Sequence, residues 1–343
     1  MDQNNFRTIQ SLGRKELINE LMENSTVQKD TVINGVGDDA AVLACREGAY
    51  SLLSSETFME GVDFDLTYTP LNHLGYKVAS SAISDIYAMK GKPDSLLVNM
   101  ALPNKLSVDM VKEIYKGIYS CGAEHDFQVV GGDLTASHQI LSMSITCQGT
   151  VGEEEIVYRR GAQEGDAVCV TGDLGGAIAG LRILLREKEY WQDSQQQQFQ
   201  PDLEDYEYVV QRQLVPFAQK KFIDTLEELK MLPSSMIDLT QGLVSELSNI
   251  TDASDTGAMI YQAALPIALE TRQVADEMKE DVDKYALYGG EDLEMLFTLK
   301  KEQVEQLADT FSNFTVIGKI TSEYDAPVMQ TGEGELVSFT EDN

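Results

Sequence analysis

The sequence predicts a two-domain protein of mixed α/β class. The chain has 343 residues, which is beyond the size at which a single hydrophobic core usually keeps growing. Strand-like and helix-like segments alternate through the first half. A new run of strand, glycine-rich turn and helix then begins at DAVCVTGDLGGAIAGLRILL. We therefore expect an N-terminal domain over residues 1–151 and a C-terminal α/β domain over residues 152–343.

The apolar spacing of the first half changes between helical and strand-like periods. Residues 6–24 carry apolar side chains on one helical face and predict an amphipathic helix. Ser107 is a typical N-cap for the helical pattern SVDMVKEIYKGIYSCGAEH. We expect a further helix at LNHLGYKVASSAISDIYAMKG, and strands at AAVL, YSLLSSETF, SLLVNMALP, FQVVGGDL (ending in a glycine turn) and LSMSITCQGTVG.

The second half contains a strand–turn–helix junction at VTGDLGGAIAGL. Backbone N–H groups at such a junction can bind an anion, although this glycine pattern more often reflects tight packing. Its spacing matches neither the G-x-x-x-x-G-K-[ST] loop nor the G-x-G-x-x-G turn. The polar residues 190–203 predict a mobile excursion. Further elements are expected at SSMIDLTQGLVSELSNI (strand, turn, helix), KYALYGGEDLEMLFTL (turn, strand) and FTVIGKITSEYDAPVMQ (strands).

The charge balance restricts the class of ligand. Lys and Arg total 26 and Asp and Glu total 57, which gives a formal net charge of −31. Such a chain disfavours nucleic acid and anionic membrane surfaces as partners. A phosphorylated small molecule would need divalent cations between its own charge and these carboxylates.

Cysteine and histidine patterns exclude several other chemistries. The four cysteines are far apart and contain no C-x-x-C pair, so neither a zinc site nor a disulfide framework is indicated. The only histidines are His73, His125 and His138, which makes Ser-His-Asp catalysis a poor candidate. No apolar signal core or membrane-spanning run is seen, and we expect a cytoplasmic protein.

Acidic residues recur where strands or helices pass into turns. In open α/β sheets this edge is where ligands bind. Asp85 differs, because helical spacing buries it between apolar residues, where an unpaired carboxylate needs a cation or loses its charge. Taken singly, each acid is more often a turn former or cap; gathered together they favour Mg²⁺. The set comprises Asp38, Asp39, Glu56, Asp85, Asp133, Asp238, Glu291 and Asp292.

Eight ordered motifs resemble those of bacterial thiamine-monophosphate kinases, in the superfamily of aminoimidazole ribonucleotide synthetase. The resemblance implies a homodimer paired through the N-terminal sheets, several Mg²⁺ ions, and ATP-dependent phosphorylation of thiamine monophosphate to thiamine diphosphate. The N-terminal domain would then carry ATP and metal binding and dimerisation. The motifs are GVGDDAAVL, SSETFMEGVDFDLTY, ISDIYAMKGKPDSLLVNMALP, VVGGDLTAS, YRRGAQEGD, VTGDLGGAIAGL, MIDLTQGL and LYGGEDLEMLFT.

The resemblance also implies roles for individual residues. No general base is implied, because a substrate phosphate oxygen is already ionised and metal-assisted positioning suffices. Metal ligands would be Asp39, Ser54, Ser55, Glu56, Asp85, Asp133, Asp238 and Gln241. ATP contacts would be Tyr115, Gly132, Asp133, Arg159 (with Arg160 as the alternative register) and Thr240, and substrate contacts would be Asp63 and Glu291.

Several positions depart from the family pattern. Glu56 replaces an aspartate, Asp63 replaces a substrate-contacting histidine, and Gln241 replaces a metal-binding aspartate. Ala82 replaces an asparagine in the N-L-S-D helix motif, and the closing tryptophan segment is not recognisable in LVSFTEDN. Two hypotheses therefore remain open: a working kinase for thiamine monophosphate or a related acceptor, or a catalytically impaired paralogue that binds nucleotide or regulates.

Overall fold

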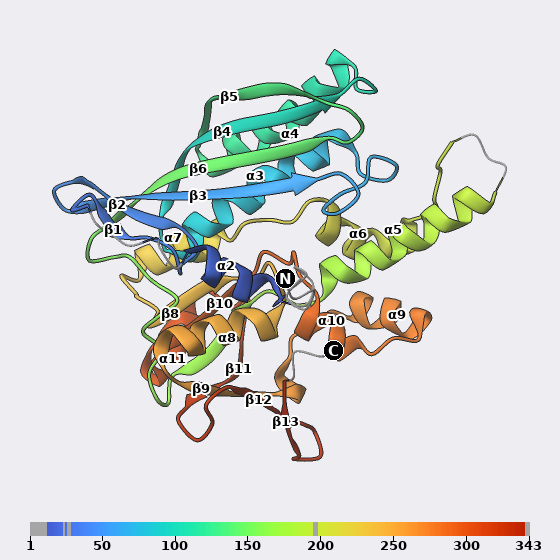
Figure 1. Cartoon of the computed structure of the whole chain (residues 1–343). Coiled ribbons are helices and arrows are strands. Elements are labelled where there is room, and N and C mark those ends of the chain that lie inside the picture. The colour runs from blue at the N-terminus through green and yellow to red at the C-terminus, as the bar shows by residue number, and fades with distance from the viewer. Residues whose placement is uncertain (1–11, 23–24, 26–28, 195–197, 340–343) are drawn as a thin grey trace, which may run out of the picture.

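A computed structural model describes residues 12–22, 25, 29–194 and 198–339, and within these ranges it has two sheets flanked by helices (Figure 1). The mixed α/β class expected from the sequence is confirmed. The beginning of the expected helix over residues 6–24 lies outside the described residues, as does part of the excursion over residues 190–203. Among the described helices, none is both long and apolar enough to span a bilayer.

The first sheet has six strands in the order β1-β2-β3-β6-β4-β5. Residues on β6 alternate between buried and half-buried along its whole length, as expected where only one face meets a core. That face is covered by α3 and α4 (Figure 1). The strands are β1 (Val32–Asn34), β2 (Ala41–Arg46), β3 (Ala49–Met59), β4 (Lys92–Pro103), β5 (Gln128–Ser137) and β6 (Ser142–Gly152); the helices are α3 (Leu71–Ala88) and α4 (Val108–His125).

Helix α3 packs closely against α4 and covers the first sheet. It lies against α4 so closely that a Cβ on Gly75 would come within 1.8 Å of the Ile114 carbonyl oxygen. A Cβ on Gly117 would approach the Asn72 carbonyl oxygen equally closely, at 1.8 Å. These glycines allow the two helices to pack backbone to backbone, which fixes α3 over the sheet. The expected burial of Asp85 on this helix is confirmed.

The second sheet has seven strands in the order β13-β12-β9-β11-β7-β10-β8. Strands β7 and β10 lie inside it and are buried throughout, which agrees with their continuous apolar sequences. The strands are β7 (Ala167–Thr171), β8 (Ser235–Asp238), β9 (Gly257–Tyr261), β10 (Met295–Leu299), β11 (Phe314–Thr321), β12 (Pro327–Gln330) and β13 (Leu336–Ser338).

The helices of the second half are mostly amphipathic and pack on this sheet or on one another. Helix α5 projects away from the sheet and is paired with α6 (Figure 1). The helices are α5 (Gly176–Asp193), η1 (Glu204–Tyr206), α6 (Glu207–Leu214), α7 (Lys220–Glu228), α8 (Leu243–Ser254), η2 (Gln262–Ala264), α9 (Leu269–Met278), α10 (Val282–Tyr288) and α11 (Lys301–Thr310), with α2 (Arg14–Met22) before the first sheet.

Three local expectations need correction. Strand β5 continues through the Gly131–Gly132 pair to Ser137, because both glycines pair with β4 and do not form a turn. The segment before GGED is the helix α10, capped by the Asp281 side chain, and not a turn alone. Helix α5 extends to Asp193, so the irregular segment is shorter than residues 190–203.

Candidate active site

Three aspartates from distant parts of the chain meet between the two sheets. Asp39 precedes β2, Asp85 lies near the end of α3, and Asp238 is the last residue of β8. One carboxylate oxygen from each lies within 4.8 Å of the others. We call these three residues the acidic centre. The sequence placed each acid at the end of an element, and the fold brings these ends together.

The environment of the acidic centre disfavours negative charge. Burial, followed by the neighbouring charges of Asp238, Glu56 and Asp39, raises the pKa of Asp85 well above its ordinary value. Burial and then Asp39 raise the pKa of Asp238 in the same way. Oδ2 of Asp39 and Oδ2 of Asp238 are buried without a hydrogen-bond partner among the described residues. Unpartnered carboxylate oxygens at this spacing fit a hard divalent cation.

Arg159 is a cationic group that contacts the acidic centre. Its Nη2 lies 2.6 Å from Oδ1 of Asp39, whose side chain is only 1% exposed. Its backbone N–H donates to Oδ1 of Asp38 at 3.1 Å. Burial, followed by the charge of Asp39, raises the pKa of Asp38 to about 7. Arg160 instead lies over the ring of Tyr158 at 4.0 Å, so Arg159 is the arginine that faces the acids.

The predicted metal ligands on strand β3 point to two different faces of the first sheet. Ser54 is buried on the helix-covered face, where its hydroxyl donates to the Ala82 carbonyl oxygen at 3.2 Å. The carboxylate of Glu56 is on the same face, and its charge raises the pKa of Asp85. The hydroxyl of Ser55 lies 3.3 Å from that of Thr146 on the opposite face. Because side chains alternate along a strand, the fold of the chain does not bring Ser55 to the acidic centre.

Residues Gly132 and Asp133 lie on β5, which pairs only with β4 at the edge of the sheet. Gly132 has a φ of +147°, and a Cβ there would meet the Val98 carbonyl oxygen at 1.8 Å, so strand packing requires a glycine. Asp133 pairs with Asn99 and is exposed on the face away from the helices. The fold does not bring Asp133 into the acidic centre of the chain, contrary to the sequence expectation.

The turn after β8 is contacted by a buried acid that was not predicted from the sequence. Glu246 on α8 is buried, and its Oε1 accepts from the Thr240 hydroxyl at 3.3 Å and from the Gln241 N–H at 3.2 Å. Burial raises its pKa. The side chain of Gln241 is exposed, so its amide is not among the buried donors. Glu246 follows Gly242, the N-cap of α8, by four residues, one more than in a capping box, so no local sequence pattern predicts this contact.

Asp63 and Glu291, the predicted substrate contacts, are not among the carboxylates that meet at the acidic centre. Oδ2 of Asp63 accepts from the Met59 N–H at 2.7 Å and closes the loop after β3. Oε2 of Glu291 lies 2.6 Å from Nζ of Lys77 on α3. Tyr115 on α4 lies against Tyr119, with ring centroids 5.8 Å apart, and no described contact joins it to the acids. Its role at a nucleotide stays a prediction.

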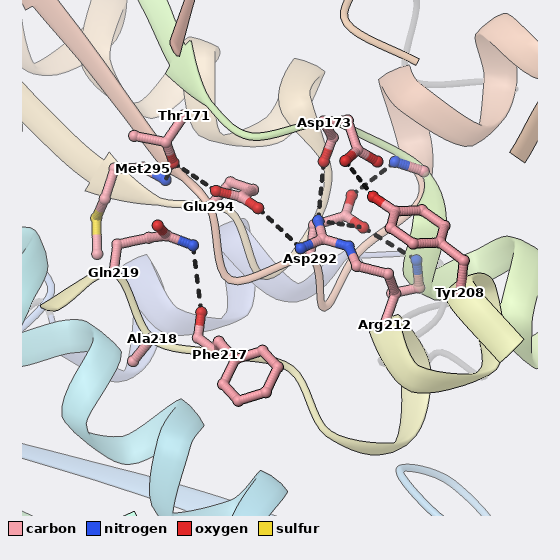
Figure 2. A network of polar contacts seen from close by, with 12 residues as sticks. Thr171, Asp173, Tyr208, Arg212, Phe217, Ala218, Gln219, Asp292, Glu294 and Met295 are labelled. Atoms are coloured by element: carbon pink, nitrogen blue, oxygen red, sulfur yellow. Dashed lines mark hydrogen bonds and ion pairs between the residues drawn. The ribbon is translucent and has the colours of Figure 1, made fainter. Parts of the chain in front are cut away.

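The glycine-rich turn before α5 is filled by the chain itself. Asp292 accepts from the Gly175 N–H at 2.8 Å and from the Ala177 N–H at 3.0 Å. Figure 2 shows Arg212 beside it, and this guanidinium donates to Glu294 at 2.8 Å. Burial raises the pKa of Asp292 to about 6, against the opposing effect of Arg212. The amides at this helix N-terminus already have an anionic partner, so packing explains the turn.

Comparisons with known proteins agree with this architecture. Residues 37–151 match the family model "AIR synthase related protein, N-terminal domain", and residues 163–328 match "AIR synthase related protein, C-terminal domain". The chain is 30% identical to a thiamine-monophosphate kinase of Aquifex aeolicus, covering 97% of this chain and 95% of that protein. It is 30% identical to the thiamine-monophosphate kinase of Bacillus subtilis, covering 82% of each.

Solved structures show the same similarity. One described as "AaThiL complexed with AMPPCP and TMP" matches with a TM-score of 0.82 at 27% identity, covering 98% of each chain. A thiamine-monophosphate kinase from Stenotrophomonas maltophilia matches with a TM-score of 0.72 at 28% identity, covering 92% of this chain and 95% of that one. The hydrogenase maturation protein HypE, at 17% identity and a TM-score of 0.67, shares the fold.

The two sheets with an acidic centre between them define a protein of the AIR synthase-related class. Within this class, the chain belongs to the thiamine-monophosphate kinase family. The resemblance drawn from the eight sequence motifs is thereby confirmed.

Proposed function

We propose that this chain transfers the γ-phosphoryl group of ATP to thiamine monophosphate and forms thiamine diphosphate. The relatives that carry this activity in their name cover most of the chain, and one similar structure is described with AMPPCP and TMP. Within the chain, one observation carries the proposal. The acidic centre presents buried carboxylate oxygens without partners, a donor set suited to the cation of a metal–nucleotide complex.

The cation we infer is Mg²⁺, in several copies. When bound, Mg²⁺ would neutralise the charge of the polyphosphate. Asp39, Asp85 and Asp238 would hold it, with Ser54 and Glu56 on the same face of β3. Arg159 would exchange its contact with Asp39 for the nucleotide phosphates, and Thr240 would contact the nucleotide from the turn after β8. No side chain has to abstract a proton, because the accepting phosphate oxygen is ionised.

We infer a homodimer that would bring the predicted site residues lying away from the acidic centre close to a second subunit. The helix-free face of the first sheet carries exposed Leu53, Met59 and Leu97, which are 39%, 40% and 42% exposed. Ser55 and Asp133 are on that same face. Pairing two copies through this face would cover the apolar side chains and place Asp133 and neighbouring Gly132 near a second subunit. Tyr115 is proposed to contact the adenine of the bound nucleotide.

We place the domain boundary at residues 151 and 152, with ATP and metal binding and dimerisation in the first domain. The absence of an apolar run in the sequence and the biosynthetic activity support a cytoplasmic location.

A second candidate function is a catalytically impaired paralogue that retains nucleotide binding, or a kinase for a related phosphorylated acceptor. The exposed side chain of Gln241 and the carboxylate at Asp63 favour it. The position of Glu56 argues against it, because this longer carboxylate still interacts with Asp85 and Asp39.

One assay separates these functions. Purified protein is incubated with ATP, Mg²⁺ and thiamine monophosphate, and thiamine diphosphate is quantified by chromatography. Turnover that requires all three components supports the proposal. Absence of turnover, combined with an ATP-dependent rise in melting temperature, would support the nucleotide-binding paralogue instead. A panel of other phosphorylated acceptors identifies a related substrate.

A further inference from the structure

Lys77 is a buried cation outside the acidic centre. Its side chain is 3% exposed, on the face of α3 that meets the second half of the chain. Its Nζ donates to Oε2 of Glu291 at 2.6 Å and to the Gln213 carbonyl oxygen at 3.2 Å. A buried ammonium group is tolerated only with such partners. Lys77 therefore fixes the location of one particular oxygen of Glu291.

Glu291 is held on its other sides as well. Its backbone has a φ of +66°, which is unusual for a residue with a side chain, and its N–H donates to the Thr240 carbonyl oxygen at 3.0 Å. Nε2 of Gln213 also donates to Oε2, at 3.3 Å. Among the described residues, nothing donates to Oε1, and the side chain is 37% exposed. Thus Oε2 of Glu291 is held by Lys77 and Gln213, whereas Oε1 remains free to accept a hydrogen bond from a ligand.

We propose that Lys77 is a positioning residue for acceptor recognition: it holds Oε2 of Glu291 so that Oε1 accepts a hydrogen bond from an amino group of the substrate. This inference rests on the proposed function and deepens it. The substrate class is an organic monophosphate whose heterocycle carries an exocyclic amino group, as thiamine monophosphate does. A carboxylate accepts only, so an oxo group at that position would face an acceptor and be rejected.

The orientation of an amide at position 291 tests this arrangement directly. In the Glu291→Gln variant, Lys77 and Gln213 both donate, so the amide oxygen should occupy the place of Oε2. The amide NH₂ would then point outward and donate. The variant should accept the 4-oxo analogue, oxythiamine monophosphate, and discriminate against the amino substrate. Without Lys77, the amide loses its strongest orienting donor and the preference should weaken.

The experiment measures kcat/KM for thiamine monophosphate and for oxythiamine monophosphate at saturating ATP. The ratio of the two kcat/KM values is independent of the fraction of active enzyme. We expect Glu291→Gln to shift it at least about tenfold toward the oxo analogue. In Lys77→Met/Glu291→Gln we expect most of that shift to disappear. Lys77→Met alone should raise KM for thiamine monophosphate about tenfold, with KM for ATP and kcat nearly unchanged.

Lys92→Met is the matched control. Lys92 also joins the two halves through an ion pair, at 2.9 Å from Glu227, and has no contact with Glu291. The Lys92→Met variant should leave the ratio of the two kcat/KM values and the KM for thiamine monophosphate unchanged. If Lys77→Met behaves like this control, or if Glu291→Gln keeps its altered selectivity without Lys77, the positioning role is wrong. If the unmodified chain forms no thiamine diphosphate, the proposed function fails and this inference fails with it.

Discussion

The guanidinium of Arg159 lies 2.6 Å from Oδ1 of Asp39, although 120 positions separate the two residues in sequence. The contact joins the segment after β6 to the turn before β2. Because Asp39 is also a member of the acidic centre, this arginine offsets part of the repulsion among the carboxylates.

Replacing Arg159 by Met should therefore affect both stability and turnover. Removing one partner of a largely buried pair costs about 3–5 kcal/mol of unfolding free energy. Turnover should fall as well, through loss of the proposed phosphate contact. Urea unfolding and steady-state kinetics measure the two effects. Arg160→Met is the control, since Arg160 is exposed on Tyr158; equal losses in the two variants would contradict the role assigned to Arg159.

Replacing Asp85 by Asn should separate stability from activity. The amide has the same shape without the charge that burial and three acidic neighbours disfavour. We expect the metal-free variant to be at least as stable as the parent. Turnover should fall about 100-fold or more, since losing one strong electrostatic contact costs roughly 3 kcal/mol of transition-state stabilisation. Asp109→Asn, at a 92% exposed side chain, is the control. A variant that keeps its turnover would remove Asp85 from the site.

The stability of the metal-free chain should fall as pH rises. The folded pKa of Asp38 is raised from 3.8 to about 7 and that of Asp292 to about 6, and those of Asp85 and Asp238 are raised too. Between the ordinary and the raised pKa, the folded state binds more protons than the unfolded state, so protonation favours folding. We expect a higher melting temperature at pH 6 than at pH 8 in chelator. A melting temperature that increases over this interval would contradict the assignment.

The double substitution Asp63→His and Gln241→Asp restores the family residues at these two positions. It tests whether their replacement has impaired the kinase activity. The Asp63 carboxylate closes the loop after β3 by accepting from the Met59 N–H at 2.7 Å, which a protonated or poorly placed imidazole does not reproduce. The backbone N–H of residue 241 donates to Glu246, so a carboxylate introduced at 241 would add negative charge close to an existing buried acid. We therefore expect turnover with thiamine monophosphate to fall several-fold. An increase would instead support the impaired-paralogue hypothesis.

Replacing Leu97 by Lys should weaken the proposed dimer. Leu97 is 42% exposed on the helix-free face of the first sheet, so a subunit alone should tolerate the change. Burying two ammonium groups between paired sheets is unfavourable. Light scattering after size exclusion should show a shift from dimer to monomer, with little change in secondary structure. Lys at Val108, which is 72% exposed on α4, is the control; an unaffected mass for Leu97→Lys would place the interface elsewhere.

Local sequence patterns predicted much of the fold and part of the site. The apolar periods marked most helices and strands, and burial of Asp85 followed from its place within α3. The acidic centre was anticipated because Asp39 and Asp238 end or precede strands. These features depend on neighbours a few residues away, which the sequence displays directly.

Features that depend on how the two halves meet were not predictable. Nothing near Lys77 in sequence indicates that Glu291 will neutralise it, because the partners are 214 residues apart. The family resemblance implied Ser55 as a metal ligand together with Ser54 and Glu56, yet strand alternation places its hydroxyl on the other face. Glu246 was overlooked because its contacts with Thr240 and Gln241 become evident only once the turn before α8 is formed.

The central claim is that Asp39, Asp85 and Asp238 hold the cation of a metal–nucleotide complex. Anomalous scattering from crystals grown with Mn²⁺ and AMPPCP tests it most directly. We predict at least one manganese peak within coordination distance of the carboxylates of the acidic centre and of a phosphate oxygen. Manganese and nucleotide bound elsewhere, with these three carboxylates bare or paired only with Arg159, would contradict the account.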